Sequence, residues 1–288
     1  MINTFSVIGG DSRNIELAKI LAQDENKVSV YGLEKHNKEI NDIKNIEICN
    51  SLGDAIEQSN IVIGPIPFSR DGETINSPFS NVEIDLEDFA SWLDKKILFA
   101  GSIPEKFYKI AKDTQAVITD IMKIEEIAIL NIIATAEGAI CKIIEETDVN
   151  LQGSNVLIIG FGRIGKILSK KLEALGAKVT CSARKQEDLA WIEAYGYNVM
   201  NTYNLQNLDK FDVIINTVPY IIFNKKILEQ VDKHCLLLEL ASSPGGFDLD
   251  YIKKSNLKYI PALGLPGKVA PKASANYIKS FIYKTLIN

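Results

Sequence analysis

The chain has 288 residues, of which 46% are hydrophobic and 24% charged, and its formal net charge is −5. This composition is that of a globular protein with one large domain or two of average size, and it excludes a disordered chain. The negative charge argues against general nucleic-acid binding, which needs a basic face to neutralise phosphates. Four scattered cysteines without a C-x-x-C pair, together with only two histidines, predict neither a disulfide framework nor a metal site.

A membrane-spanning segment is not expected. The longest apolar stretch, residues 127–140, is interrupted by polar residues and is shorter than the roughly 20 residues that a spanning helix needs. The N-terminus has neither the basic region nor the cleavage site of a signal peptide. The sequence therefore predicts a cytoplasmic protein that binds no membrane.

Short β-rich runs alternate with helical patterns in the first part of the chain, and the predicted strands are residues 4–8, 28–31, 61–63 and 96–100. Such alternation is typical of a parallel sheet. Residues 124–146 then form a long helix, or two helices that meet near Asn131. Because this segment is apolar on more than one face, we expect it to be buried between two domains or to be an ordinary core helix.

The alternation restarts after this helix. The predicted strands are residues 155–159, 178–182, 213–216, 235–240 and 259–260, and residues 164–175 form a helix. The last predicted helix, residues 273–286, carries an apolar stripe. We expect this stripe to fold back against the first domain, because an apolar helix face must be covered.

Residues 160–165 match the pattern G-x-G-x-x-G and lie between a predicted strand and a predicted helix, which is the context of a dinucleotide-binding fold. Side chains at Gly160 and Gly162 would hold a pyrophosphate away from the backbone, and Gly165 lets the helix pack closely on its strand. The phosphates would lie at the helix N-terminus, where unpaired N–H groups favour anions. A tight strand-to-helix turn without a ligand is the alternative.

We therefore predict an α/β protein with two open parallel-sheet, Rossmann-like domains, an interdomain cleft, a long connecting helix and a C-terminal helix that returns to the first domain. The substrate domain comprises residues 1–123 with residues 268–288, the connecting helical segment is 124–149, and the cofactor-binding domain is 150–267.

The end of the second strand in the cofactor domain indicates which dinucleotide binds. Most NAD-binding folds place an acid there for the ribose 2′-hydroxyl, whereas this chain has Ser182, Arg184 and Lys185. A hydroxyl followed by two cations would receive a 2′-phosphate, so we expect NADP in preference to NAD, unless the cations are only solvated loop charges. Two later loops, residues 217–219 and 241–246, end successive strands and are further cofactor candidates.

Arginine is rare in this chain, with four among 32 basic residues, and two of the four lie in the cofactor region. The other two, Arg13 and Arg70, lie in turns of the first domain. Arginine suits bidentate contacts with carboxylates, so these two would suit a small carboxylate or dicarboxylate substrate, with local contacts to backbone carbonyls or Asp neighbours as the alternative. Asp11 disfavours a phosphate in the turn at residues 9–13, which makes this turn a substrate-side element.

Motifs of serine hydrolases, P-loop proteins and zinc proteases do not occur in the sequence, and neither histidine lies in a recognisable motif. A histidine-dependent hydride-transfer mechanism is therefore not expected. The acid–base candidates that remain are Lys123, Glu125, Glu137, Glu239 and Lys268.

Five motifs, taken in order, resemble the dipicolinate synthase A-subunit family. They are residues 7–13 (VIGGDSR), 135–140 (TAEGAI), 160–165 (GFGRIG), 241–246 (ASSPGG) and 262–271 (ALGLPGKVAP). The resemblance spans essentially the full chain, and its last motif is the most specific. One departure is Ala134, where the family pattern has proline.

The resemblance implies an NADP-dependent oxidoreductase that oxidises dihydrodipicolinate to dipicolinate (pyridine-2,6-dicarboxylate) during sporulation, in a branch from the lysine pathway. It implies that the partner is a flavoprotein-like B subunit and that the location is the cytoplasm of the mother cell, and we also expect a homo-oligomer. Another NADP-dependent dehydrogenase, of the shikimate or alanine dehydrogenase type, and a non-catalytic NADP-binding protein that assists the B subunit remain alternatives.

The expected site residues follow from these motifs. The catalytic candidates are Glu137 and Lys268. The substrate-binding candidates are Arg13, Ser69, Arg70, Ser102, Thr135 and Ser242. The cofactor-binding candidates are Gly160, Phe161, Gly162, Arg163, Ile164, Gly165, Ser182, Arg184, Lys185, Thr217, Val218, Pro219 and Ala241.

Overall fold

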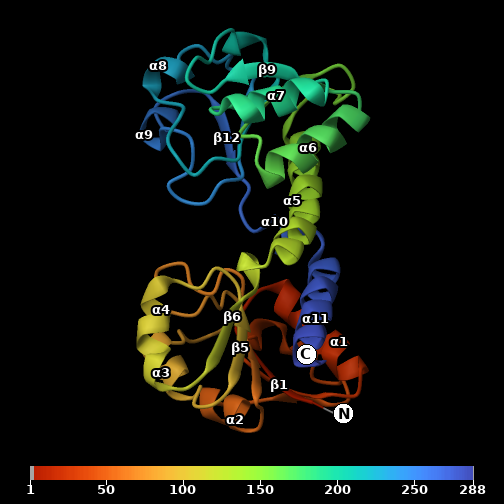
Figure 1. Ribbon diagram of the computed structural model, residues 1–288, viewed down its shortest axis with the longest axis vertical. Helices are drawn as coiled ribbons and strands as arrows, with labels where there is room; N and C mark the ends of the chain where they lie inside the picture. Colours follow the sequence, from red (N-terminus) through yellow and green to blue (C-terminus); the bar gives the residue numbers. More distant parts are fainter. Residues whose placement is uncertain (1–2, 288) are drawn as a thin grey trace. The chain divides into compact units, whose positions relative to one another are not determined.

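A computed structural model describes residues 3–287 and divides the chain into two compact units (Figure 1). The first unit is Met1–Asn131 with Pro266–Asn288, and the second is Ile132–Leu265. Each unit holds one parallel six-stranded sheet with helices, so the predicted α/β fold class is confirmed. The boundary between the units falls inside helix α5 (Glu125–Glu146), where the sequence predicts a separate connecting segment.

The sheet of the first unit has the strand order β3-β2-β1-β4-β5-β6. Its strands are β1 (Thr4–Ile8), β2 (Lys27–Tyr31), β3 (Ile46–Ile48), β4 (Ile61–Ile63), β5 (Ile97–Ala100) and β6 (Val117–Asp120). Its helices are α1 (Ser12–Gln23), α2 (Leu52–Glu57), α3 (Leu86–Ser91) and α4 (Glu105–Ile110), with 3-10 turns η1 (Glu34–Glu39), η2 (Ala111–Asp113) and η3 (Ile121–Lys123). Because the sheet is covered on both faces, its central strands are continuous apolar runs.

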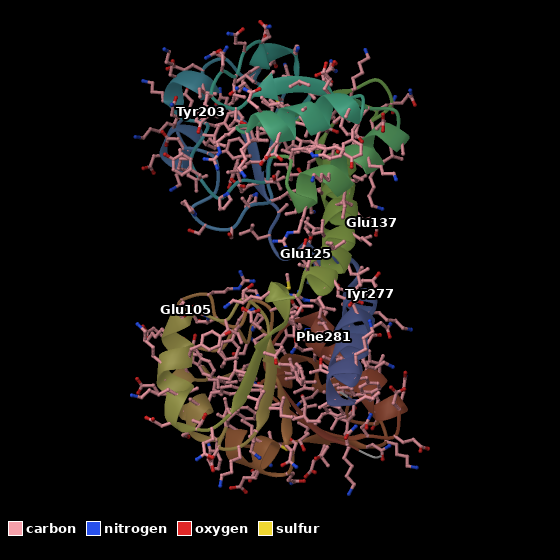
Figure 2. The ribbon with its side chains drawn as sticks, viewed as in Figure 1. Glu105, Glu125, Glu137, Tyr203, Tyr277 and Phe281 are labelled. Carbon is pink, nitrogen blue, oxygen red and sulfur yellow. The ribbon has the colours of Figure 1, made fainter. Side chains whose placement is uncertain are left out.

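The C-terminal helix α11 (Pro271–Ile287) packs on α1 in this unit, as the apolar stripe predicts (Figure 1). Ile278 and Ile282 are buried in the same core cluster as Phe5 of β1. Phe281, labelled in Figure 2, meets the ring of Phe99 edge-on, with 6.2 Å between ring centroids. Residues far apart in the sequence thus share one core.

The sheet of the second unit has the order β12-β11-β10-β7-β8-β9. Its strands are β7 (Asn155–Ile159), β8 (Lys178–Ala183), β9 (Asn198–Asn201), β10 (Val213–Asn216), β11 (Leu236–Glu239) and β12 (Lys258–Pro261). Its helices are α6 (Arg163–Ala174), α7 (Gln186–Ala194), α8 (Lys225–Leu228) and α9 (Leu249–Ile252), with the 3-10 turn η4 (Leu208–Lys210), and the short helix α10 (Leu265–Val269) follows.

Both sheets have the strand order of a doubly wound dinucleotide-binding fold, in which the winding reverses between the first and fourth strands. Ligands of such sheets bind outside the carboxyl ends of the strands, beside this reversal. In the second unit the reversal lies between β7 and β10, and the loops that follow these two strands therefore define where a ligand is expected.

Helix α5 is one continuous helix, so the alternative of two helices near Asn131 is wrong. With 22 residues it is also longer than the apolar stretch seen in the sequence, and by length and composition it could cross a membrane. Half of its most apolar window is buried within the protein, as in a core helix of a water-soluble fold. The rest is not covered as the sequence predicts, since Ile144 is 60% exposed.

Candidate functional site

The three glycines of the turn between β7 and α6 each meet a different requirement. Gly160 has a φ of +97°, and a Cβ atom there would lie 2.5 Å from the hydroxyl oxygen of Thr217. A Cβ atom at Gly165 would strike the carbonyl oxygen of Gly160, so the helix approaches its strand as closely as the backbone allows. Nothing lies within 4 Å of the corresponding position at Gly162, which leaves open space for a ligand. This is the division of roles that pyrophosphate binding requires.

The N-terminus of α6 can receive an anion. Gly162 is its N-cap and has no side chain with which to bond the first N–H groups of the helix, and these groups carry the positive end of the helix dipole. The ring of Phe161 is 4% exposed and packs in the core, 5.9 Å from the ring of Tyr195. Phe161 therefore offers the site only its backbone, whereas Arg163 is exposed.

A pocket of about 300 Å³ lies beyond the carboxyl ends of β8 and β9. It is lined by Arg184, Thr202, Tyr203, Val218, Tyr220, Ile221, Ile222 and Ile227. Tyr203, labelled in Figure 2, is 78% exposed and provides a flat aromatic face beside a guanidinium group. Such a pocket fits an adenine ring with a phosphate nearby. The sequence reasoning missed Tyr203 and Tyr220, although each follows a strand end.

The three polar residues predicted at the end of β8 differ in their surroundings. Arg184 is exposed and lines the pocket, and Lys185 is exposed with its ammonium group 3.2 Å from Glu187. Ser182 is fully buried, and its hydroxyl bonds the hydroxyl of Thr202 at 3.0 Å. The prediction that the Ser182 hydroxyl contacts a 2′-phosphate is therefore wrong, because this hydroxyl links β8 to the end of β9.

The loops after β10 and β11 lie at neighbouring strand ends. Thr217 donates its hydroxyl to the carbonyl of Ile159 at 2.8 Å, which joins the β10 loop to the end of β7. Val218 is half-buried and Pro219 exposed. In the next loop Ala241 is buried, while Ser242 is exposed and its carbonyl accepts the N–H of Gly245. The predicted cofactor residues of the second unit are thus gathered at one end of its sheet.

Glu239 ends β11 and is only 3% exposed. Burial raises the pKa of its carboxyl group, and hydrogen bonds from the Gly246 N–H, the Asn216 amide and the Ala241 N–H oppose this shift. Because all these donors come from the protein, Glu239 is a structural anchor and is removed from the acid–base candidates.

Glu137, a predicted catalytic residue, is paired with Lys171 of α6 at 2.9 Å (Figure 2). Lys171 lies eight residues after Arg163, which at 1.5 Å per residue is about 12 Å along the helix from its anion-binding end. The prediction for Glu137 is therefore wrong, since its carboxylate lies beside the far half of α6. Thr135 is half-buried on the same helix α5.

In the first unit the turn between β1 and α1 is closed by its own side chains. The guanidinium of Arg13 bonds both carboxylate oxygens of Asp11, at 2.9 and 2.8 Å, and also the carbonyl of Ile66. Arg13 is 4% exposed, so it holds two loops together, and the prediction that it binds substrate is wrong. Asp11 also caps α1, which leaves no room for a phosphate, and Gly267 lies directly against its carboxylate.

Arg70 lines a second pocket, of about 310 Å³. Its Nε atom donates to Asn76 at 3.0 Å, and the carbonyl of Asn76 accepts the N–H of Gly10, so Asn76 joins Arg70 to the β1–α1 turn. Ser69 is engaged within its own loop, where its hydroxyl donates to Asp71. The pKa of Asp71 is strongly lowered, chiefly by a backbone hydrogen bond from Thr74.

Two further predicted residues lie elsewhere in this unit. Ser102 is exposed after β5, and its N–H bonds the carboxylate of Asp120 at 2.9 Å. Lys268 is exposed on α10, next to the glycine that touches Asp11. Within residues 3–287 there is no group of three or more His, Cys, Asp and Glu side chains that could hold a metal ion.

Comparison with known proteins agrees with this geometry. Residues 4–122 match the N-terminal domain of the dipicolinate synthase A subunit, and residues 135–243 match the NAD-binding domain of D-isomer-specific 2-hydroxyacid dehydrogenases. The chain is 31% identical to the dipicolinate synthase A subunit of Bacillus subtilis (strain 168), over 98% of this chain and 95% of that protein.

Two crystal structures are also similar over the whole chain. That of the dipicolinate synthase A chain from Bacillus subtilis has a TM-score of 0.84 at 31% identity, covering 100% of this chain and 96% of that one. The dipicolinate synthase A subunit from Bacillus halodurans has a TM-score of 0.87 at 29% identity, covering 99% and 98%. A nicotinamide cofactor fits the open glycine turn and the aromatic pocket of the second unit. The chain therefore belongs to the dipicolinate synthase A-subunit family, whose second domain is of the NAD(P)-dependent dehydrogenase type.

Proposed function

We propose that this chain is an NADP-dependent oxidoreductase that converts dihydrodipicolinate to dipicolinate during sporulation, in the cytoplasm of the mother cell and on a branch of the lysine pathway. The observation that carries the cofactor choice is Arg184, which lines the adenosine-sized pocket at the end of β8, where an acid would select NAD. Family membership supports the reaction, because the relatives carry the name of the synthase that makes dipicolinate.

The reaction removes a hydride and a proton from a partly reduced pyridine ring. When bound, the cofactor supplies an acceptor for the hydride at C4 of its nicotinamide ring. Since formation of the aromatic ring supplies driving force, the main task of the protein is to orient the substrate. Arg70, with its Nε fixed by Asn76, is proposed to bind a substrate carboxylate, and exposed Lys268 to take up the proton directly or through water.

Ser69, Ser102, Thr135 and Ser242 stay proposed substrate contacts; of these, Ser102 and Ser242 are exposed at strand ends. A second protein is also proposed to bind this chain, since the relatives are named by the letter of one component in a larger synthase. A flavoprotein-like B subunit is the proposed partner.

One assay tests this function. The purified chain is mixed with freshly generated dihydrodipicolinate and either NADP or NAD, with and without the B subunit, while absorbance at 340 nm is followed. We expect reduction of NADP by this chain, faster than reduction of NAD. Turnover of shikimate or alanine instead would identify another dehydrogenase.

A non-catalytic cofactor-binding component is the second candidate. It is favoured by the loss of two acid–base candidates, since Glu137 is paired with Lys171 and Glu239 is buried. Under this alternative NADP binds to the chain, but the 340 nm signal is absent without the B subunit. With both proteins present, Lys268→Ala would then leave the rate unchanged.

A further inference from the structure

Asn216 and Glu239 stand opposite each other at the carboxyl ends of β10 and β11. Their side chains are 0% and 3% exposed, and the amide nitrogen of Asn216 donates to one carboxylate oxygen of Glu239 at 2.7 Å. A carboxylate removed from water is costly unless several donors surround it. The remaining donors to Glu239 come from a loop, not from a cation.

The loop at residues 241–246 is built on the Glu239 carboxylate. One oxygen accepts the N–H of Ala241 at 2.9 Å and the other accepts the N–H of Gly246 at 2.6 Å, so both ends of the loop meet on one side chain. Gly245 has a φ of +78°, and a Cβ atom there would lie 2.7 Å from the same carboxylate. The shape of this loop therefore depends on a buried negative charge.

Asn216 performs the same task for the loop after β10. Its amide donates to the carbonyl of Val218 at 2.8 Å and accepts the N–H of Val218 at 3.2 Å. Val218 is one wall of the pocket that contains Arg184 and Tyr203. Asn216 thus acts on the adenosine side of the sheet reversal, whereas the loop on Glu239 follows the next strand, on the opposite side.

We propose that Asn216 and Glu239 are a buried pair of positioning residues, in which Glu239 shapes the loop that receives the nicotinamide half of the cofactor and Asn216 shapes both loops. This inference rests on the proposed nicotinamide-dependent function. A dinucleotide that binds across the reversal places its two halves on opposite sides of it, which assigns the adenosine half to the Arg184 pocket and the nicotinamide half to residues 241–246.

The test compares Glu239→Gln, Asn216→Ala and a matched control, Glu146→Gln. Glu146 is a partly buried glutamate of the same unit whose carboxylate pairs with Lys258 at 2.9 Å, at the amino end of β12. Dissociation constants are measured by calorimetry for NADP and NAD. The same constants are measured for 2′-phospho-ADP-ribose and ADP-ribose, which lack the nicotinamide ring.

In Glu239→Gln a donor replaces one acceptor oxygen, so the variant keeps the side-chain size but loses one bond to the loop. We expect its affinity for the dinucleotide to fall roughly tenfold or more, the usual effect of losing a hydrogen bond to a charged group, with fragment affinity within about twofold of the wild type. Asn216→Ala is expected to weaken both kinds of ligand, and Glu146→Gln neither. Glu239→Asp, which keeps the charge but shortens the reach, should show the same selective loss if the glutamine variant fails to fold.

Equal losses for dinucleotide and fragment in the Glu239 variants would overturn the inference, because they would mean general damage to the unit. Unchanged dinucleotide affinity would overturn it as well. If the wild-type chain binds no dinucleotide at all, the proposed function fails and the inference fails with it, an outcome visible before any variant is measured.

Discussion

The α-carbon of Gly165 lies directly against the carbonyl oxygen of Gly160, so the first turn of α6 touches the end of β7 through backbone atoms alone. Between them, Gly162 faces open space. Two glycines of one motif therefore serve different purposes, since one allows packing and the other allows a ligand to approach.

Gly165→Ala and Gly162→Ala separate these purposes. The methyl group at Gly165 would overlap backbone that cannot move aside, so we expect the free energy of unfolding to fall by about 1–3 kcal/mol, together with cofactor affinity. Gly162→Ala should leave stability within about 0.5 kcal/mol while weakening cofactor binding. Urea unfolding and cofactor titration measure both. Equal stability losses in the two variants would contradict this assignment.

Arg184→Ala tests the choice between the two dinucleotides. Loss of the guanidinium that lines the adenosine pocket should weaken NADP binding roughly 10- to 100-fold and leave NAD binding nearly unchanged. Lys185→Ala is the matched control, because Lys185 is exposed and pairs with Glu187. Fluorescence titration with each cofactor checks the result. A chain that binds NAD more tightly than NADP before mutation would show that this interpretation of Arg184 is mistaken.

The two arginines of the first unit should behave differently in a binding assay. Arg70→Ala is expected to raise the KM for the dicarboxylate substrate roughly 10-fold or more, with cofactor affinity unchanged. Arg70→Lys should recover only part of the loss, because lysine cannot make a bidentate contact. Steady-state kinetics measure both variants, and an unaltered KM in Arg70→Ala would remove Arg70 from the site.

Arg13→Met should act on stability. It removes one partner of a largely buried ion pair and leaves Asp11 without its bidentate contact. Breaking such a pair costs about 3–5 kcal/mol when both partners are fully buried, and we expect roughly 2–3 kcal/mol here, because the Asp11 side chain is 22% exposed. Arg70→Met, at an exposed position, is the control in the same unfolding measurement. A wild-type unfolding curve for Arg13→Met would argue that the pair is not structural.

The four cysteines predict a pH-dependent labelling pattern. Burial raises the pKa of the Cys181 and Cys235 thiols to about 12, and Cys49 is also buried. Cys141 is exposed, with its pKa raised chiefly by a hydrogen bond to Glu145. Iodoacetamide should therefore modify only Cys141 in the folded chain, faster as the pH rises and the thiolate fraction grows. Mass spectrometry after labelling detects the sites, and Cys141→Ser should abolish the reaction. Modification of Cys181 before unfolding would contradict the burial.

The strands that the sequence did not predict share one physical property. β3, β6 and β9 are edge strands of three or four residues, half-covered or exposed along much of their length. An edge strand buries too little to need a continuous apolar run, so its pattern does not stand out from a loop. The central strands, buried on both faces, were all recognisable from their apolar runs.

By itself the sequence determined the fold class, the glycine turn at residues 160–165 and the family resemblance. Each of these depends on residues close together in the chain, where spacing fixes geometry. Only the tertiary structure decided the fate of single polar side chains. Arg13 is bound by Asp11, Glu137 by Lys171, and Glu239 lies under its own loop. Whether a charged group faces a ligand or a neighbouring strand depends on contacts between distant segments, which no local pattern encodes.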